Sequence, residues 1–242
     1  MNNYTKHSNP VNSNTVLNGE PLISDVYLMD CMELMKQYPD NYFDLAVVDP
    51  PYGLGYSTSA GKKSGEKYGK SATSKRNYDI KEWDNSAPNL DYFNELIRVS
   101  KNQIIWGANH FISKIPFDSS CWIVWDKNNS ENNFADCELA WTSFNSAVRK
   151  LKYTWHGMIQ ENMKNKEQRF HPTQKPVALY DWIFKNYASE GMTILDTHLG
   201  SGSSRIAANK AKLHFVACEL DADYFNAQNK RYEEFISQLR II

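Results

Sequence analysis

The sequence predicts an α/β fold built on a doubly wound, mostly parallel sheet, and three observations lead to this prediction. Short apolar runs that end in an acidic residue, such as 43–48 before Asp49, have the length and composition of buried strands. Helical patterns separate these runs along the chain. Two strands joined through a helix form a βαβ unit, and such units build parallel sheets.

Length and composition fit one folded domain. A chain of 242 residues is long enough for a single α/β domain with a sizeable core. Its 41% hydrophobic content, with 14 Tyr and 11 Phe, supplies the apolar area that disordered chains lack. We expect a flexible N-terminal arm without secondary structure over 1–20, which is rich in Asn, Ser and Thr, and one domain over 21–242.

Charge and cysteine pattern narrow the class of protein. The formal net charge is −1, so any contact with nucleic acid must come from local basic segments. The four cysteines form no CxxC pair and follow no secretory signal, which favours a reducing, cytoplasmic compartment. No apolar run reaches the roughly 18 residues that a membrane-spanning helix needs, and we expect no metal site.

The predicted strands are short apolar runs. The first ends at Asp30 and the second at Asp49, and both endings fit the edge of a parallel sheet. In chain order the predicted strands are 25–29, 43–48, 103–106, 121–125, 138–141, 148–155, 193–195 and 214–218.

Helical patterns fill most of the intervals between these strands. The first helix stops near Pro39, since proline cannot continue a helix. The predicted helices are 32–35, 90–99, 109–114, 177–187, 203–211 and 222–239. Two stretches without a sustained period, Gly53 to about Pro88 and His156 to Arg169, are predicted as loops, and loops of such length are usually functional or mobile.

The first chemical signal is a strand that leads through a glycine turn into a helix. Asp196 ends the strand, and Gly200 and Gly202 follow before the helix 203–211. Glycine permits close approach of a ligand, and the helix N-terminus offers free amide donors. Glu219 ends the next strand, where a carboxylate can accept both hydroxyls of a ribose. A plain tight turn and a solvated carboxylate are the alternatives, but the pair favours a nucleotide-type ligand.

The second chemical signal is Asp49-Pro50-Pro51-Tyr52 at the end of the strand 43–48. Two consecutive prolines stiffen the loop and remove two amide donors, so carbonyl oxygens are left as acceptors. A carboxylate beside a proline carbonyl suits the two N–H bonds of an exocyclic amine, and Tyr52 offers a stacking face. A rigid turn with a buried Tyr is the structural alternative.

Three motifs in a fixed order make the sequence similar to a known family. Asp49-Pro50-Pro51-Tyr52 resembles the DPPY motif of the amino-group (N6-adenine or N4-cytosine) DNA methyltransferases, and Asp196–Ser203 resembles their S-adenosylmethionine motif. His171-Pro172-Thr173-Gln174-Lys175-Pro176 matches their HPTQKP element. The catalytic motif precedes the cofactor motif, which is the circularly permuted order of the β group. The resemblance covers about 25 to 240, and it implies a Rossmann-like methyltransferase fold and a bacterial or phage-encoded enzyme.

The resemblance also assigns roles to single residues. Asp49, Pro50, Pro51 and Tyr52 are the implied catalytic residues. The residues implied to bind S-adenosylmethionine are Asp30, Cys31, Asp49, Thr173, Lys175, Asp196, His198, Gly200, Ser201, Gly202, Ser203, Glu219 and Leu220. In this set Asp30 would bind the adenine amine of the cofactor, and Thr173 and Lys175 its methionine end. An Asp at a strand end also often caps a helix, and His198 departs from the Phe or Pro frequent in the family, which leaves its role open.

The implied reaction is direct transfer of the cofactor methyl group to the exocyclic N6 amine of adenine in double-stranded DNA. Asp49, rather than Ser, at the start of the catalytic motif favours adenine over cytosine. Asp49 and the Pro50 carbonyl would accept hydrogen bonds from the amine, and Tyr52 would hold the base in line. The amine cannot be reached inside a duplex, so the base must be flipped out, at a cost of about a few kcal/mol.

Two local basic segments are predicted to contact DNA. The predicted DNA-binding residues are Lys62, Lys63, Lys67, Lys70, Lys75 and Arg76 in the first loop, and Lys164, Lys166 and Arg169 in the second. We expect inserted loops at about 53–88 and 128–170 to recognise the target sequence, although a solvated insertion is the alternative for the first. The sequence leaves open whether a homodimer forms and whether a cognate restriction endonuclease exists.

Other functions fit the sequence less well. An N4-cytosine DNA methyltransferase is the nearest alternative, and RNA or a protein amide would also present a planar amine. The catalytic loop of the protein-amide enzymes usually begins with Asn, and a carbon-5 cytosine enzyme needs a Cys that usually follows Pro, a pair that this sequence lacks. A non-catalytic nucleic-acid-binding module is disfavoured by the intact Asp49 and Tyr52.

Overall fold

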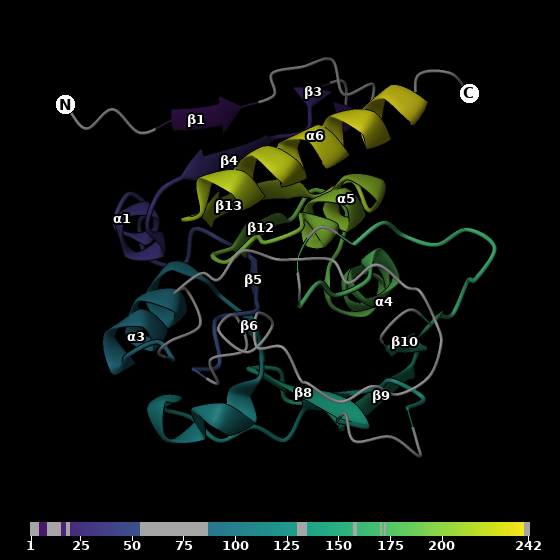
Figure 1. The fold of residues 1–242 in the computed structure, drawn as a ribbon. Helices are drawn as coiled ribbons and strands as arrows, with labels where there is room; N and C mark the ends of the chain where they lie inside the picture. Colours follow the sequence, from purple (N-terminus) through teal and green to yellow (C-terminus); the bar gives the residue numbers. More distant parts are fainter. Residues whose placement is uncertain are drawn as a thin grey trace, which may run out of the picture.

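The computed structural model describes residues 5–8, 16–17, 20–53, 87–129, 135–156, 159–169, 171 and 173–239. These residues form a nine-stranded sheet with helices on both faces (Figure 1). In order across the sheet the strands are β1 (Thr5–Ser8), β4 (Ser24–Leu28), β13 (His214–Glu219), β12 (Thr193–Asp196), β5 (Leu45–Val48), β6 (Gln103–Trp106), β8 (Cys137–Thr142), β7 (Trp122–Asp126) and β9 (Arg149–Lys152). Neighbours from β4 to β6 are parallel, which confirms the predicted mostly parallel sheet.

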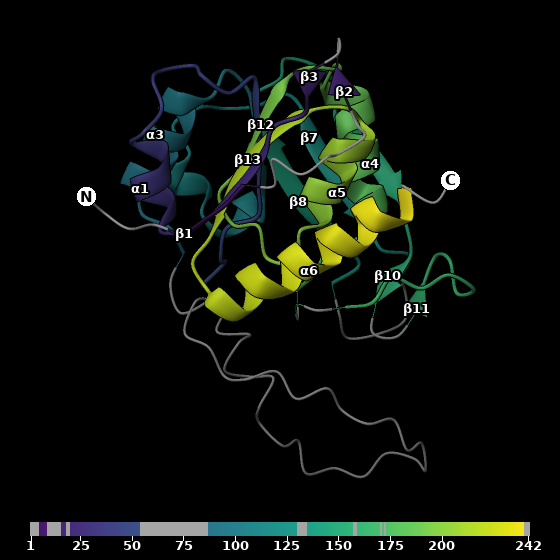
Figure 2. The ribbon, with the colours of Figure 1, turned by 90° about the horizontal axis from the view of Figure 1, so that it is seen from above.

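The helices divide between the two faces of this sheet. They are α1 (Cys31–Met35), α3 (Leu90–Val99), α4 (Val177–Tyr187), α5 (Ser203–Lys210) and α6 (Ala222–Leu239). Figure 2 shows α1 and α3 on one side of the strands and α4, α5 and α6 on the other. The bounds of α3, α4 and α6 are those that the sequence predicted.

The central strand β5 shows why both faces need helices. All four of its residues are buried. Leu45 and Val47 join the apolar core that contains α4 and α5, whereas Ala46 and Val48 join the core that contains α1 and α3. Successive strand residues point to opposite faces, so a strand that is apolar throughout must be covered twice.

The predicted helix over 109–114 was wrong. Two 3₁₀ turns replace it, η1 (Ala108–His110) and η2 (Ile112–Lys114). Gly107 before them is left-handed, with φ of 67°, and Phe111 between them has φ of −143°, which no α-helix accommodates. The backbone therefore bends twice where a regular helix would continue.

Two further predictions failed between β9 and α4. The single strand predicted over 148–155 is two strands, β9 and β10 (Trp155–His156), because β9 pairs with β7 only as far as Lys152 and β10 has a different partner. The stretch 156–169 is not wholly a loop, since β10 pairs antiparallel with β11 (Ile159–Gln160). This hairpin is too short to show a strand period in the sequence.

The prediction that 1–20 lacks secondary structure was wrong for three short segments. β1 pairs antiparallel with β4, and β2 (Val16–Leu17) pairs with β3 (Glu20–Pro21). The free edge of β4 offers unpaired backbone groups that any extended segment can satisfy, so no apolar period is needed. Within the described part of the chain, no helix is long and apolar enough to cross a membrane.

Candidate active site

Carboxylates lie in a row along one edge of the sheet. β4, β13, β12 and β5 are parallel neighbours, so their carboxyl ends meet at the same edge. The acidic residues at or just beyond these ends are, in that order, Asp30, Glu219, Asp196 and Asp49. The fold thus brings predicted cofactor residues and the predicted catalytic Asp49 together from distant parts of the chain.

Local hydrogen bonds hold the β12–α5 turn (Thr197–Gly202), which follows Asp196. One carboxylate oxygen of Asp196 accepts the His198 amide at 3.1 Å, and the other accepts the Ser204 hydroxyl at 2.6 Å. Burial raises the pKa of Asp196 to about 7, although these two bonds act in the opposite direction. The side chain therefore shapes the turn rather than presenting a permanent charge.

Glycines are required at two positions of the same turn. Gly200 and Gly202 have φ of 53° and 73°, in the left-handed region that favours glycine. A Cβ added at Gly202 would also lie 3.1 Å from Gln228 Cβ of α6. The turn can therefore pass close beneath α6 only without a side chain at Gly202.

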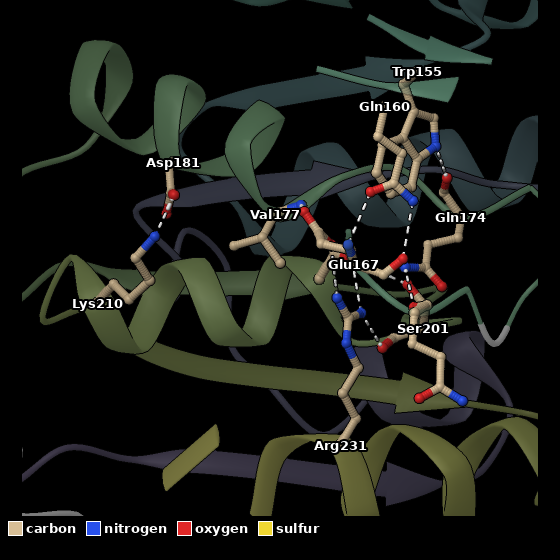
Figure 3. A network of polar contacts seen from close by, with 11 residues as sticks. Trp155, Gln160, Glu167, Gln174, Val177, Asp181, Ser201, Lys210 and Arg231 are labelled. Atoms are coloured by element: carbon tan, nitrogen blue, oxygen red, sulfur yellow. Dashed lines mark hydrogen bonds and ion pairs between the residues drawn. The ribbon is translucent and has the colours of Figure 1, made fainter. Parts of the chain in front are cut away.

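Helix α6 holds this turn from the opposite side. Arg231 Nη1 donates to the Ser201 carbonyl and to the Ser203 hydroxyl, both at 2.9 Å. Its Nη2 donates to Glu167 at 2.9 Å, as Figure 3 shows. Ser201 and Ser203, predicted to bind the cofactor, are buried by this arrangement and keep the turn in shape.

Glu219 joins the β12–α5 turn to the start of α6. Its carboxylate accepts the Gly200 amide at 2.8 Å and the Asp221 amide at 2.9 Å. Burial raises its pKa, and the two amide bonds oppose that rise. Leu220 beside it is 70% exposed, so an acidic group and an open apolar side chain lie next to each other.

Asp30 caps the N-terminus of α1, which is the alternative role that the sequence allowed. Its Oδ1 accepts the amides of Met32 at 2.8 Å and Glu33 at 3.3 Å. Cys31, the first residue of α1, is half-buried, and burial raises the pKa of its thiol to about 12. Cys31 is therefore a neutral side chain rather than a nucleophile.

His198 is neutral in this structure. Burial lowers the pKa of its imidazole to about 4. Its Nδ1 lies 2.9 Å from the Thr197 hydroxyl, which in turn lies 2.7 Å from the Tyr92 hydroxyl. His198 thus ends a chain of uncharged hydrogen bonds that anchors the turn to α3.

The catalytic loop after β5 is fixed by Tyr52. Its hydroxyl donates to Asp49 Oδ1 at 2.8 Å, and its ring stacks on His110 with centroids 5.0 Å apart and planes at 19°. Gly107 lies so close that an added Cβ would be 2.1 Å from the Tyr52 ring. Pro50 is buried beneath the loop. Burial and the Asp49 charge raise the pKa of Tyr52 well above its usual value, so the hydroxyl stays protonated.

Asp49 also belongs to a lysine–carboxylate cluster of Asp49, Lys175, Glu138 and Lys127. Lys175 Nζ lies 2.5 Å from Asp49 Oδ2, 3.1 Å from Glu138 Oε2 and 3.2 Å from the Tyr52 hydroxyl. Lys127 forms an ion pair with the other oxygen of Glu138. Burial alone would raise the pKa of Glu138, but the two lysines lower it to about 2. Burial alone would lower the pKa of Lys175, but Asp49 and Glu138 raise it, so Lys175 and Glu138 are both charged.

The loop that precedes α4 places Lys175 in this cluster. Thr173 turns away, with its hydroxyl 3.1 Å from His171 Nδ1. The Gln174 carbonyl accepts the Trp155 indole N–H at 2.8 Å, and the Gln174 side chain donates to the Gln168 carbonyl at 3.1 Å (Figure 3). The sequence grouped Thr173 with Lys175, but Thr173 is exposed, whereas Lys175 is buried in the cluster.

The predicted DNA-binding residues lie in three settings. Lys164 and Lys166 are exposed in the segment after β11. Arg169 is half-buried, and its guanidinium lies over the Trp155 ring, 4.5 Å from the centroid. The residues that lie outside the described part of the chain are Lys62, Lys63, Lys67, Lys70, Lys75 and Arg76.

The sequence did not single out Glu138, Lys127, His110 or Arg231. Glu138 carried one usable signal, since a carboxylate inside the apolar strand Cys137–Thr142 needs a partner. Lys127 and His110 follow strand ends, but nothing in their spacing distinguishes them from surface residues. Arg231 stands in a helix with many charged residues, so only the tertiary contact reveals it.

Comparison with known proteins finds similarity to DNA methyltransferases. The family model N6_N4_Mtase, described as DNA methylase, matches residues 119–230. The type II methyltransferase M2.MboI of Moraxella bovis is 24% identical over 253 residues, covering 89% of this chain and 90% of its own length. The matched family segment includes Lys175 and the β12–α5 turn, while Asp49–Tyr52 lie before it.

Solved structures share the fold. The complex of M1.HpyAVI with S-adenosylmethionine has a TM-score of 0.52 and 20% identity, covering 85% of this chain and 98% of its own. The cytosine-N4-specific PvuII DNA methyltransferase has a TM-score of 0.56 and 14% identity, covering 88% of this chain and 89% of its own. Both matches cover at least 85% of this chain.

Proposed function

Since this chain belongs to the N6/N4 DNA methylase family, whose model matches residues 119–230, we propose that it methylates the N6 amine of adenine in double-stranded DNA. One observation supports this most directly. β5 and β12 are parallel neighbours, with Ala46 opposite Leu195, so the Asp49–Tyr52 loop and the β12–α5 turn emerge side by side. A group that accepts an amine and a turn that suits a nucleotide-type ligand thus share one edge.

The residues at the turn fit S-adenosylmethionine. Glu219 holds a carboxylate beside the exposed apolar Leu220, which suits a ribose next to an adenine ring. Gly200, left-handed and half-exposed, leaves the backbone open to close approach. Our proposed cofactor residues remain Asp30, Cys31, Asp49, Thr173, Lys175, Asp196, His198, Gly200, Ser201, Gly202, Ser203, Glu219 and Leu220.

In this set the residues have unequal tasks. Ser201, Gly202 and Ser203 are buried and support the turn from within. The proposed role of Lys175 at the methionine end has no support in its contacts, since its ammonium lies on Asp49. Asp30 caps α1 through one oxygen and keeps the other for a ligand.

The catalytic groups in our proposal are Asp49, Pro50, Pro51 and Tyr52. When bound, the cofactor supplies an electrophilic sulfonium methyl group. Asp49 and the Pro50 carbonyl accept the two N–H bonds of the amine, which directs the nitrogen lone pair away from the ring. The Tyr52 hydroxyl donates to Asp49 and keeps that carboxylate in one orientation. Asp49 is also the acceptor for the proton that the nitrogen loses as its bond to carbon forms.

In our proposal the flipped base stacks on the Tyr52 ring, against which His110 already stacks. The His110 ring lies nearly parallel to the Tyr52 ring, at 19°, and it is exposed. We expect this ring to leave when the base stacks on Tyr52, since both occupy the same kind of position.

DNA contact in our proposal comes from basic side chains around this edge. Lys164 and Lys166 are exposed basic side chains, so they suit contact with phosphate groups. Arg169 is committed to the Trp155 ring and would contribute less. The six basic residues from Lys62 to Arg76 stay a prediction.

The decisive test is expression in a methylation-free bacterial host, followed by mapping of modified bases in the host DNA by sequencing. We expect N6-methyladenine at one short motif. N4-methylcytosine instead would change the base but keep the enzyme class. DNA without any modified base, from cells that contain the folded protein, would contradict the proposal.

A further inference from the structure

The lysine–carboxylate cluster holds a residue whose position suggests a task in the reaction. Glu138 is the second residue of β8, and it lies opposite Trp125 of β7. β8 runs antiparallel to β6, with Ala140 opposite Trp106 at the end of that strand. The start of β8 therefore reaches the edge of the sheet where β5 ends and the catalytic loop begins.

Lys175 connects Glu138 to the catalytic loop. Its side chain is 4% exposed, so water cannot stabilise its ammonium group. Its ammonium donates hydrogen bonds to Asp49 and to the Tyr52 hydroxyl, and Glu138 Oε2 lies at ion-pair distance, 3.1 Å, without a hydrogen bond of its own. The charge of Lys175 is thus shared by two carboxylates.

This sharing matters because Asp49 has to bind a neutral amine. A carboxylate that carries a buried cation alone is a weaker acceptor for a second donor, since the cation withdraws its negative charge. Glu138 neutralises part of the positive charge of the Lys175 ammonium, so Asp49 keeps more of its own negative charge for a second donor. Lys127 forms an ion pair with Glu138 and lies at the end of β7, so it fixes Glu138 in place.

We propose that Glu138 is a positioning residue for methyl transfer: it holds the Lys175 ammonium between two carboxylates, so that Asp49 remains able to accept the target amine. Lys127 supports Glu138 in this position. The inference rests on the proposed function, because the amine is the substrate of the proposed reaction.

Glu138→Gln tests the inference, because the amide keeps the size of the side chain and removes its charge. With DNA from the methylation-free host as substrate, we expect kcat to fall about 30-fold and the KM for S-adenosylmethionine to stay within about twofold. The acid limb of the pH profile of kcat should move to lower pH, because the variant removes a negative charge beside the ion pair of Lys175 with Asp49. Glu138→Asp should recover part of the rate.

Glu190→Gln is the matched control. Glu190 forms an exposed ion pair with Lys212 at 3.0 Å, away from the cluster, so this variant should keep the wild-type rate and pH profile. A Glu138→Gln variant with wild-type kcat and pH profile would overturn the proposal. So would an equal loss of rate and cofactor affinity, because that result indicates a structural role.

A second measurement does not depend on methyl transfer. A buried, ion-paired ammonium exchanges its protons slowly, so the Lys175 ammonium should give a distinct ¹⁵N NMR signal in the wild-type protein. That signal should shift in Glu138→Gln and remain in place in Glu190→Gln. If the wild-type protein does not methylate DNA, the proposed function fails, while an unshifted Lys175 signal refutes the role of Glu138 separately.

Discussion

Two carboxylates near the same edge of the sheet have opposite electrostatic environments. Asp196, at the β12–α5 turn, is held by hydrogen bonds from a hydroxyl and an amide, and burial raises its pKa to about 7. Glu138, in the lysine–carboxylate cluster, is also buried, which by itself would raise its pKa, but Lys175 and Lys127 lower that pKa to about 2. Asp196 is thus held by hydrogen bonds from neutral groups, and Glu138 by ion pairs.

This difference separates two tasks. The turn needs a fixed backbone shape, which short-range hydrogen bonds and glycines supply at little electrostatic cost. The cluster needs a carboxylate at Asp49 that can accept an amine, and the buried Lys175 ammonium beside it holds that carboxylate in place. Ion pairs are therefore concentrated in the lysine–carboxylate cluster, where an amine would react. The β12–α5 turn, where a cofactor would bind, instead has a fixed backbone conformation.

The largest expected effect tests the charged region. Asp49→Ala should lower the rate of methyl transfer by at least about 10³-fold, because it removes the main acceptor for the amine. The Kd for S-adenosylmethionine, measured by calorimetry, should change less than about threefold, because Asp49, although one of the proposed cofactor residues, takes no part in the hydrogen bonds that hold the turn. Methyl transfer at the wild-type rate would remove Asp49 from the mechanism.

The opposite pKa shifts predict opposite dependences of stability on pH. A carboxyl with a raised pKa in the folded state stabilises the fold at low pH, and this contribution is lost as pH rises towards 7. Asp196→Asn should therefore gain stability relative to the wild type, on the order of 2 kcal/mol, between pH 4 and pH 7. Urea denaturation at several pH values measures this difference.

Glu138→Gln should show a pH dependence of stability opposite in sign to that of Asp196→Asn. Because the pKa of Glu138 is lowered in the folded state, its ionised carboxylate stabilises the fold above about pH 4.5. This contribution is lost as pH falls towards 2. This variant should lose stability relative to the wild type as pH rises from 3 to 5. Parallel curves for both variants would contradict the contrast between the two regions.

A smaller effect tests the shape of the turn. Gly202→Ala should lower the free energy of unfolding by about 2 kcal/mol, because it combines a left-handed backbone with a 3.1 Å approach to Gln228 Cβ. Gly200→Ala has the same backbone penalty but a nearest contact of 3.8 Å, so about 1 kcal/mol is expected. Equal losses in urea denaturation would show that the packing of α6 on the turn is unimportant.

The last expected effect concerns cofactor affinity. Glu219→Gln keeps the size of the side chain but replaces an oxygen acceptor and removes the charge that would face the ribose. We expect the Kd for S-adenosylmethionine to rise about tenfold, or about 1.4 kcal/mol, with little change in kcat. Glu190→Gln serves as the surface control, and the same Kd in both variants would exclude Glu219 from cofactor binding.

Local patterns explain which predictions succeeded. The strand that ends at Asp196, the following glycine turn and the helix from Ser203 are adjacent in sequence, so periodicity and turn residues predict them. The helix over 109–114 failed for the same reason, because a left-handed Gly107 packed on Tyr52 is a tertiary requirement. The β1 strand failed because backbone pairing at a sheet edge leaves no mark in the side chains.

The sequence by itself determined the parallel α/β sheet, the stiff Asp49–Tyr52 loop and the turn that ends at Gly202, because each depends on neighbouring residues. Only the tertiary structure decided that Lys175 meets Asp49, 126 residues away, and that Glu138 holds the same ammonium. Which strands become neighbours depends on packing of the whole chain, and no spacing in the sequence encodes it. The opposite charge states of Asp196 and Glu138 follow from that packing alone.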